Sequence, residues 1–358
     1  MNPRKNRLIL AAAVLLLTAL GIILISRGDH PVSSVARADI LSGKKTRSDL
    51  SESHDERGMP RSRAPKVRQE FSNFVKLMGE GDPPKLSAAQ LETYVNSAGR
   101  NVDSLLAAFR LGKDEAYLKE ALEKFPHNPQ VLLEAARMGN DPAKRLEILD
   151  RMRSEAPGNG LVDLMSAKAL FDLGKDEEAF ARLRSSAGKP LDDFTRSSWQ
   201  NGEEAYASAG YSAAEAKLSS MYSLTKPEAI QSRGMGDKLV KLRQGYEAAG
   251  DHESAEMVVS AQLELARQIG DGACVVEKLV GLVHEKMVVK GDESPEADEI
   301  RADIVLRRDA LVASANKVSE MMKSTAVPES DWVNYFDRTK LFGENAANDW
   351  LLEKYPQH

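Results

Sequence analysis

Glycine residues punctuate this chain at helix-length intervals, and this feature constrains its fold more than any other. Each lies between an apolar stretch with helical periodicity and a second stretch that usually opens with acidic residues and alanine, as in LGKDEEA at 173–179. Glycine tolerates the left-handed conformation found just past helix ends. Recurrence at roughly 30–40 residues is typical of helical solenoids. The six turns that we predict are at Gly112, Gly139, Gly174, Gly210, Gly250 and Gly343.

Residues 161–190 show how one unit is built. Apolar side chains recur at helical spacing over 161–171, and Gly174 then marks the end of a first helix. Asp176 begins an acidic run that suits the positive end of a second helix dipole. Pro190 closes the unit, because proline cannot continue a helix. The unit is therefore predicted to be two helices joined by a tight turn.

Residues 199–227 resemble the tetratricopeptide repeat (TPR). Trp199 and Tyr206 are seven apart, as in the first helix of that repeat, and Gly210 follows Tyr206 by four. Pro227 falls where the repeat ends. Large aromatic side chains in these positions are expected to fill the space between the two helices of a pair.

The resemblance implies an all-α fold, namely a TPR-like right-handed α-solenoid of antiparallel helix pairs. We expect the repeats over residues 69–290 and a further repeat-like helix pair over 327–358. The repeat is divergent, because Gly202 and Glu203 stand where the family has Leu-Gly. The spacings between turns also vary, from 27 to 93 residues.

Residues 291–326 interrupt the repeat pattern. Ser294 followed by Pro295 is a good helix start, with a capping side chain before a proline in the first turn. A long core helix is favoured over a dimerising coiled coil, because the heptad phase is not sustained. Its expected apolar set is Ile300, Ile304, Leu311, Ala315, Val318 and Met322.

The N-terminal segment is apolar for long enough to cross a membrane. Residues 8–25 read LILAAAVLLLTALGIILI, without a charge, and would form a helix of ~27 Å. We therefore predict a basic flank at 1–7 and a transmembrane signal anchor at 8–26. A cleaved signal peptide is the second interpretation, although the Ala-x-Ala at 36–38 lies far beyond the apolar run. A buried soluble helix is the third.

Basic residues predict the orientation of this segment. They are more numerous before it than shortly after it, which favours a cytoplasmic N-terminus and an extracytoplasmic body. In a Gram-negative bacterium the body would lie in the periplasm, and cleavage of the segment would release it as a secreted protein. Residues 27–68 are rich in serine, charge and proline and are predicted to be a disordered linker.

Charge is distributed unevenly along the chain. Residues 1–68 carry 13 basic and 6 acidic residues, whereas the rest carries 36 basic and 48 acidic residues. An acidic body is poorly suited to nucleic acids, whose phosphates require clustered lysine and arginine. We therefore expect no nucleic-acid partner.

Signatures of catalysis are largely absent from the sequence. P-loop, GxGxxG and GxSxG patterns do not occur. His284-Glu285 begins like a zinc-protease motif, but Val288 stands where the second histidine is required. Cys274 is the single cysteine and is predicted to be a small buried hydrophobe. We expect no enzymatic activity, no metal site and no small-molecule cofactor.

A stack of helix pairs has a concave face that suits extended peptides or other proteins. The sequence therefore favours a membrane-tethered protein–protein interaction scaffold or adaptor. Two alternatives remain open: an envelope glycan-binding or hydrolytic protein on a helical superhelix, and a self-assembling structural protein. The resemblance places groove residues on the first helix of each pair, and packing or solvent exposure is the competing role for each. The candidates by repeat position are Lys168, Phe171, Gln244 and Glu247.

Overall fold

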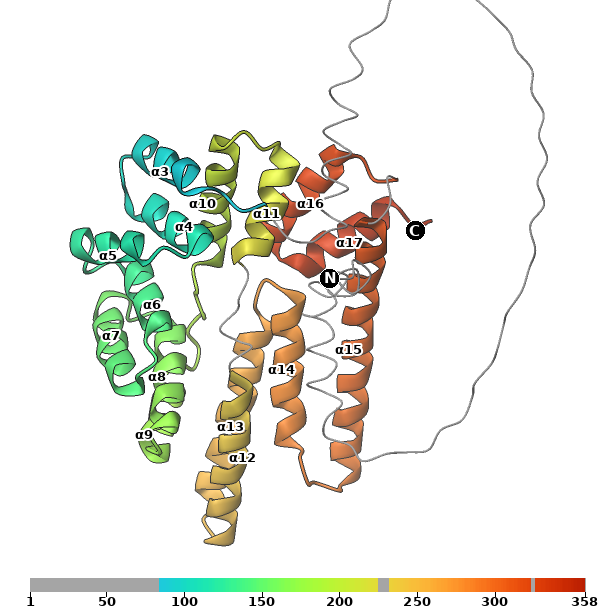
Figure 1. Ribbon diagram of the computed structural model, residues 1–358. Helices are drawn as coiled ribbons and strands as arrows, with labels where there is room; N and C mark the ends of the chain where they lie inside the picture. The colour runs from blue at the N-terminus through green and yellow to red at the C-terminus, as the bar shows by residue number, and fades with distance from the viewer. Residues whose placement is uncertain (1–83, 225–231, 323–325, 358) are drawn as a thin grey trace, which may run out of the picture.

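The computed structural model describes residues 84–224, 232–322 and 326–357. These ranges contain fifteen α-helices and no strand, which confirms the predicted all-α class (Figure 1). The helices are α3 (Ala88–Ser97), α4 (Val102–Gly112), α5 (Glu115–Lys124), α6 (Pro129–Met138), α7 (Pro142–Glu155), α8 (Gly160–Asp172), α9 (Asp176–Ser185), α10 (Thr195–Ser208), α11 (Ala213–Leu224), α12 (Arg233–Ala248), α13 (His252–Gly270), α14 (Val275–Val288), α15 (Pro295–Met322), α16 (Glu329–Phe342) and α17 (Glu344–Lys354).

Several predictions concern residues outside these ranges. The basic flank at 1–7, the membrane anchor at 8–26 and the linker at 27–68 lie wholly outside them, as does Pro227. Among the helices of the described ranges, none combines the length and apolar character needed to span a bilayer.

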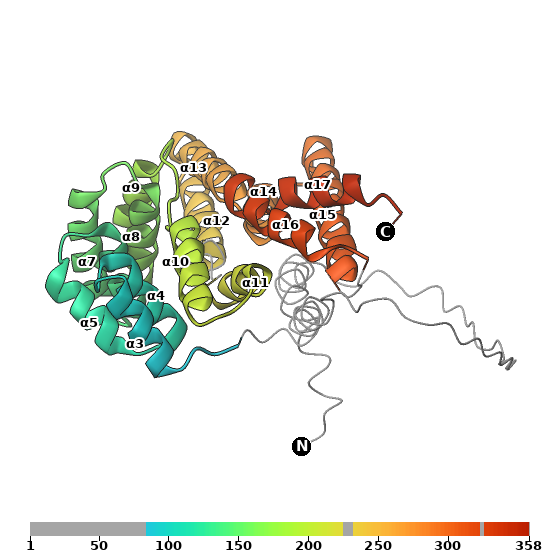
Figure 2. The same cartoon turned by 90° about the horizontal axis from the view of Figure 1, so that it is seen from above.

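The first seven described helices, α3 to α9, follow one another around an arc (Figure 2). Helices that are neighbours in the chain pack against each other, as α8 does with α9. Helix α10 does not extend this series beyond α9. It returns to the beginning of the arc and packs against α3 and α4, and α11 packs against α10 and α4. The arrangement therefore departs from an open stack in which each repeat contacts only its neighbours.

The remaining helices build a second part of the body beside the arc. Helices α12, α13 and α14 pack on one another, and α12 and α13 also touch α8 and α9. The long α15 packs against α14 and α17, and α16 pairs with α17 (Figure 1). Helix α11 packs against α16 and so joins the end of the arc to the C-terminal helices.

Four of the predicted glycine turns adopt the left-handed conformation. Their φ angles are +72° at Gly174, +92° at Gly210, +74° at Gly250 and +89° at Gly343. Side chains with a Cβ rarely adopt this conformation, so glycine is the natural residue at each of these helix junctions.

The other two predicted turns need glycine for different reasons, or not at all. Gly112 is the last residue of α4, and Lys113 is the residue that adopts the left-handed conformation there. A Cβ at Gly112 would lie 2.7 Å from Leu91 Cδ1, so this glycine allows α3 and α4 to approach closely. Gly139 caps α6 with an extended backbone and has no close neighbour that excludes a side chain.

The two aromatic residues of α10 are buried, but not simply between paired helices as expected. Trp199 packs with Cys274 and Val276 at the beginning of α14. Tyr206 belongs to the core that α10 shares with α3 and α4, and its hydroxyl donates to the carbonyl of Pro84 at 3.0 Å. These contacts correct the prediction, because each aromatic side chain joins α10 to a helix far away in the sequence. Cys274 itself is buried, as predicted.

The long helix predicted after residue 291 is α15. The Ser294 hydroxyl accepts a hydrogen bond from the Ala297 amide, which is the expected cap at its beginning. Ile304 and Ala315 pack against α14 in a shared apolar cluster. Ile300, which was expected on the apolar face, is instead 44% exposed.

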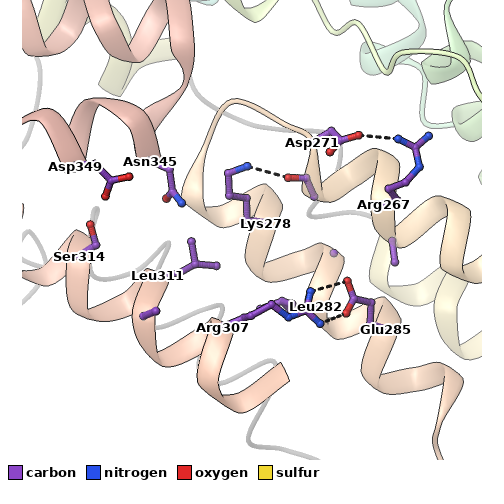
Figure 3. A pocket seen from close by; sticks show the side chains of 14 residues that line it. Arg267, Asp271, Lys278, Leu282, Glu285, Arg307, Leu311, Ser314, Asn345 and Asp349 are labelled. Atoms are coloured by element: carbon purple, nitrogen blue, oxygen red, sulfur yellow. Dashed lines mark hydrogen bonds and ion pairs between the residues drawn. The ribbon is translucent and has the colours of Figure 1, made fainter. Parts of the chain in front are cut away.

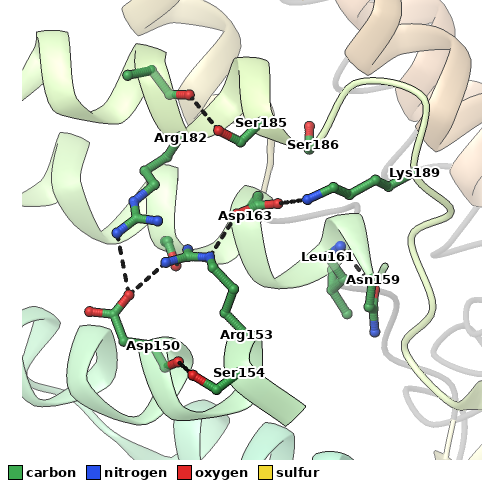
Figure 4. A network of polar contacts seen from close by, with 12 residues as sticks. Asp150, Arg153, Ser154, Asn159, Leu161, Asp163, Arg182, Ser185, Ser186 and Lys189 are labelled. Atoms are coloured by element: carbon green, nitrogen blue, oxygen red, sulfur yellow. Dashed lines mark hydrogen bonds and ion pairs between the residues drawn. The ribbon is translucent and has the colours of Figure 1, made fainter. Parts of the chain in front are cut away.

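Buried polar contacts tie α7, α8 and the chain after α9 together (Figure 4). Asp163 on α8 accepts hydrogen bonds from Arg153 Nε at 2.9 Å and from Lys189 Nζ at 2.7 Å. Arg153 also donates to Asp150 and Ser166. Because a buried carboxylate is costly unless it is paired, this network fixes the position of α8 within the arc.

The crossing of α13 and α14 generates a testable prediction. A Cβ at Gly281 would lie 2.7 Å from the carbonyl oxygen of Ala266 and 3.1 Å from Gly270 Cα, and neither backbone atom can move alone. We expect Gly281→Ala to lower the free energy of unfolding by about 1–3 kcal/mol, because overpacking forces a backbone shift. Urea denaturation of the full chain measures the change.

Gly245 provides the matched control. It lies inside α12, and a Cβ there would meet open space. Gly245→Ala should raise the free energy of unfolding by about 0.5–1 kcal/mol, because alanine favours the helix. Equal stability of the two alanine variants would contradict the close crossing of α13 and α14.

Candidate ligand-binding groove

A cavity of about 350 Å³ lies on the inside of the arc, between α4, α6, α8 and α10. We name this cavity the α4–α10 groove. Most of its lining comes from α4, α6, α8 and α10, which are the first helices of consecutive pairs. Five basic side chains line it, against two carboxylates. The basic residues are Arg110, Lys113, Arg137, Arg145 and Lys168, and the acidic residues are Glu134 and Asp193.

Two charged residues are carried into the groove by otherwise apolar helix segments. Arg110 ends the buried run SLLAAFR of α4, and Glu134 lies within the buried run VLLE of α6. Arg110 is 7% exposed and Glu134 is 5% exposed. Arg110 Nε donates to Glu134 Oε1 at 2.9 Å, and Arg137 Nη1 donates to the same oxygen at 2.8 Å.

The two guanidinium groups determine the ionisation of Glu134. Burial raises the pKa of this carboxyl, but the charges and hydrogen bonds of Arg110 and Arg137 outweigh burial. The pKa of Glu134 therefore lies below its usual value, and the group is ionised at neutral pH. The buried triad of Arg110, Glu134 and Arg137 then carries two positive charges and one negative charge.

Arg110 has more donor capacity than Glu134 uses. Its Nη2 lies 2.9 Å from the same Glu134 oxygen that accepts from Nε, which is close enough for electrostatic attraction. Within the described ranges, however, neither Nη1 nor Nη2 makes a hydrogen bond, although both atoms are buried. Buried donors without partners are rare and costly, so the outer edge of this guanidinium is poised for an acceptor.

The rim of the groove mixes apolar and polar groups. Phe109, Met138 and Met165 line it, and Met138 is 45% exposed. Thr195 and Ser198 contribute hydroxyl-bearing side chains from α10. A molecule that binds here would therefore meet apolar surface, hydroxyl groups and an excess of positive charge.

One of the four predicted groove residues lines this cavity. Lys168 does so and pairs with Asp172 one turn later in α8, at 2.9 Å. Phe171 is only 3% exposed and packs in the core that α8 shares with α12, so its side chain is not available to a ligand. Gln244 and Glu247 are exposed on α12, outside this groove, and Glu247 pairs with Arg243.

The sequence contained a signal for the residues that this prediction missed. Arg110 and Glu134 are each the only charged residue in a run of apolar side chains. Charged residues are almost never fully buried unless they are paired, so two such residues of opposite sign suggest a buried pair. The sequence did not indicate that one edge of the arginine would be left without an acceptor.

A second cavity, of about 510 Å³, lies between α13, α14, α15 and α17 (Figure 3). Its charged groups largely satisfy one another. Arg307 on α15 pairs with Glu285 on α14, and Arg267 pairs with Asp271 at 2.9 Å. Lys278 Nζ donates to the carbonyl of Gly270 at 3.0 Å. This internal pairing makes the second cavity a weaker candidate than the α4–α10 groove.

The histidine of the incomplete zinc-protease motif has a structural environment. His284 is fully buried, and its Nε2 lies 3.0 Å from the Ser232 hydroxyl. Burial lowers its pKa to about 4, so the ring is neutral at pH 7. The described residues contain no cluster of three or more side chains suited to a metal ion.

Two buried carboxylates hold the beginning of α14. Glu277 accepts a hydrogen bond from the Cys274 amide at 2.9 Å, and Glu344 accepts one from the Val275 amide at 2.8 Å. Burial raises the pKa of both carboxyls, and that of Glu277 rises to about 7. These groups join α14 to α17 and contact no cavity at the α4–α10 groove.

No family model, no curated protein and no solved structure matches this chain. The chemistry of the α4–α10 groove must therefore be interpreted from its own residues.

The raised pKa of Glu277 predicts how stability depends on pH. Its stabilising protonated form is fully present below pH 4.5, and the contribution is lost as pH rises through about 7. Glu277→Gln keeps an acceptor oxygen for the Cys274 amide but removes the charge. We expect this variant to gain on the order of 1–3 kcal/mol over the wild type at pH 8, and little at pH 4.5.

Thermal unfolding of the full chain at both pH values tests this expectation. Glu256→Gln, on an exposed position of α13, is the control and should change stability little at either pH. The same shift for Glu277→Gln at pH 8 and pH 4.5 would exclude a buried, perturbed carboxyl at the beginning of α14.

Proposed function

We propose that this protein is a membrane-tethered interaction scaffold whose helical body binds an extended segment of another protein. The observation that supports this function is the α4–α10 groove, with its excess of basic side chains beside exposed apolar surface. Concave faces of helical arrays provide large recognition surfaces and little intrinsic chemistry. Residues such as Lys168 and Thr195 would contact the bound segment directly.

We further propose that the helix pairs are divergent tetratricopeptide-type repeats. The pairs α8–α9, α10–α11 and α16–α17 support this proposal, since each is joined through a left-handed glycine. The proposed repeats differ from a regular solenoid in that α10 turns back onto α4. This return adds α10 as a further wall to the groove and narrows the face that a solenoid would leave open.

The tether is proposed from the sequence. An apolar segment at 8–26 would anchor the chain, and the linker at 27–68 would connect it to the body on the extracytoplasmic side of the membrane. A flexible linker of this length would have a typical span of ~35 Å. The body would then find its partners close to the bilayer, in the periplasm if the source is Gram-negative.

Site-specific photo-crosslinking tests the proposed function. A photoreactive amino acid replaces Lys168 in the groove of the full-length chain, expressed in its native cell. A second chain carries the same group at Glu178, an exposed position on α9. We expect one protein to be captured in stoichiometric amount from position 168 and not from position 178.

Other outcomes would contradict the proposal. Identical capture from both positions would show non-specific proximity, and no capture from position 168 would remove the groove as a protein-binding site. Crosslinks only between copies of this chain would favour self-assembly over scaffolding.

A further inference from the structure

We propose that Arg110 forms the floor of a carboxylate-binding subsite, which receives an acidic side chain of the segment bound in the α4–α10 groove. This inference rests on the proposed function, because it names the chemistry of the partner. Arg110 combines near-complete burial, a fixed orientation and unused donors, and all three are properties of a built site.

The geometry of the guanidinium specifies the shape of its ligand. An arginine can bind a carboxylate through two parallel N–H groups along one edge. The edge that contains Nε already faces Glu134, which fixes the plane of the group. The outer edge, formed by Nη1 and Nη2, is buried and lacks hydrogen-bond acceptors within the described ranges. Two oxygens of one carboxylate match the spacing of these two donors.

The charge of the buried triad specifies the charge of the ligand. Arg110 and Arg137 share the single carboxylate of Glu134, so the triad has one uncompensated positive charge. A monoanion neutralises this charge. A doubly charged phosphate would leave a negative charge in a site lined by Ala136 and Met165, where desolvation is costly. The site therefore fits a carboxylate better than a phosphate.

The surroundings of the subsite indicate that the carboxylate belongs to a chain. Met138 is exposed beside the triad, and Phe109 and Met165 add apolar surface. These groups would pack against apolar neighbours of an acidic residue. Lys168 at the rim already pairs with Asp172, so the specificity for a carboxylate is expected to depend on Arg110.

Calorimetry with defined probes tests the proposal on the full-length protein in detergent. The first probe is the capped peptide acetyl-Ala-Leu-Glu-Leu-Ala-amide, and the second replaces its glutamate with glutamine. We expect the glutamate peptide to bind at least about tenfold more tightly than the glutamine peptide, because a charge-assisted bidentate pair is lost in the latter. Sodium acetate and inorganic phosphate are the third and fourth probes.

Variants assign any preference to the buried triad. Arg110→Met should abolish the preference for glutamate, whereas Lys168→Met should retain most of it. Because Arg110→Met leaves Glu134 with only Arg137, the double variant Arg110→Met/Glu134→Gln removes both charges of the pair and guards against misfolding. Circular dichroism establishes that each variant is folded.

Each outcome decides the proposal. A glutamate preference that disappears with Arg110 supports it, and competition by acetate would identify the carboxylate itself as the recognised group. Equal binding of the two peptides, absence of binding, or stronger binding of phosphate would overturn it. Crosslinking from position 168 could still succeed in those cases, so the subsite would fail without the proposed scaffold function failing.

Discussion

The packing of α10 against α4 is the contact on which the rest of the body depends. Asn201 Nδ2 donates to Asp103 Oδ1 at 2.9 Å, and the Tyr94 hydroxyl donates to the carbonyl of Asn201 at 3.2 Å. These bonds, together with the buried side chain of Tyr206, hold α10 at the beginning of the arc. Helix α10 thereby brings Thr195 opposite the basic residues of α4, α6 and α8. Without this contact the arc would have a concave surface but no enclosed groove.

The buried triad is the polar exception within an apolar interface. Replacing a buried ion pair by apolar side chains is often neutral or stabilising, so such pairs are weak evidence of a stabilising role. Here Arg110 and Glu134 satisfy each other only in part, since the outer edge of Arg110 lacks an acceptor among the described residues. The incomplete pairing is easier to reconcile with ligand recognition than with stability alone. The cost of burying the guanidinium would be offset when a ligand supplies the missing acceptor.

Local features of this fold were predictable from the sequence, whereas contacts between distant segments were not. Gly174 and Gly210 mark helix ends through their own backbone conformation, and Ser294 caps α15 through a residue three positions away. The return of α10 to α4 leaves no comparable local trace, because it depends on pairs such as Asn201 and Asp103. The site divides in the same way. Lys168 follows from its repeat position, but burial of Phe171 and the pairing of Arg110 with Glu134 arise only in the folded body.

The return of α10 also determines how the body can fold and change in length. Tyr206 and Pro84 are 122 residues apart in the sequence, yet their hydrogen bond closes the arc. A linear array of repeats can fold from any point and tolerates the gain or loss of a unit at its end. In this body, the helices between α4 and α10 form a closed circuit, so removing one pair would separate the two helices that must meet. Closure of so long a loop must precede the contacts that reward it, which slows folding and makes the arc cooperative as a whole.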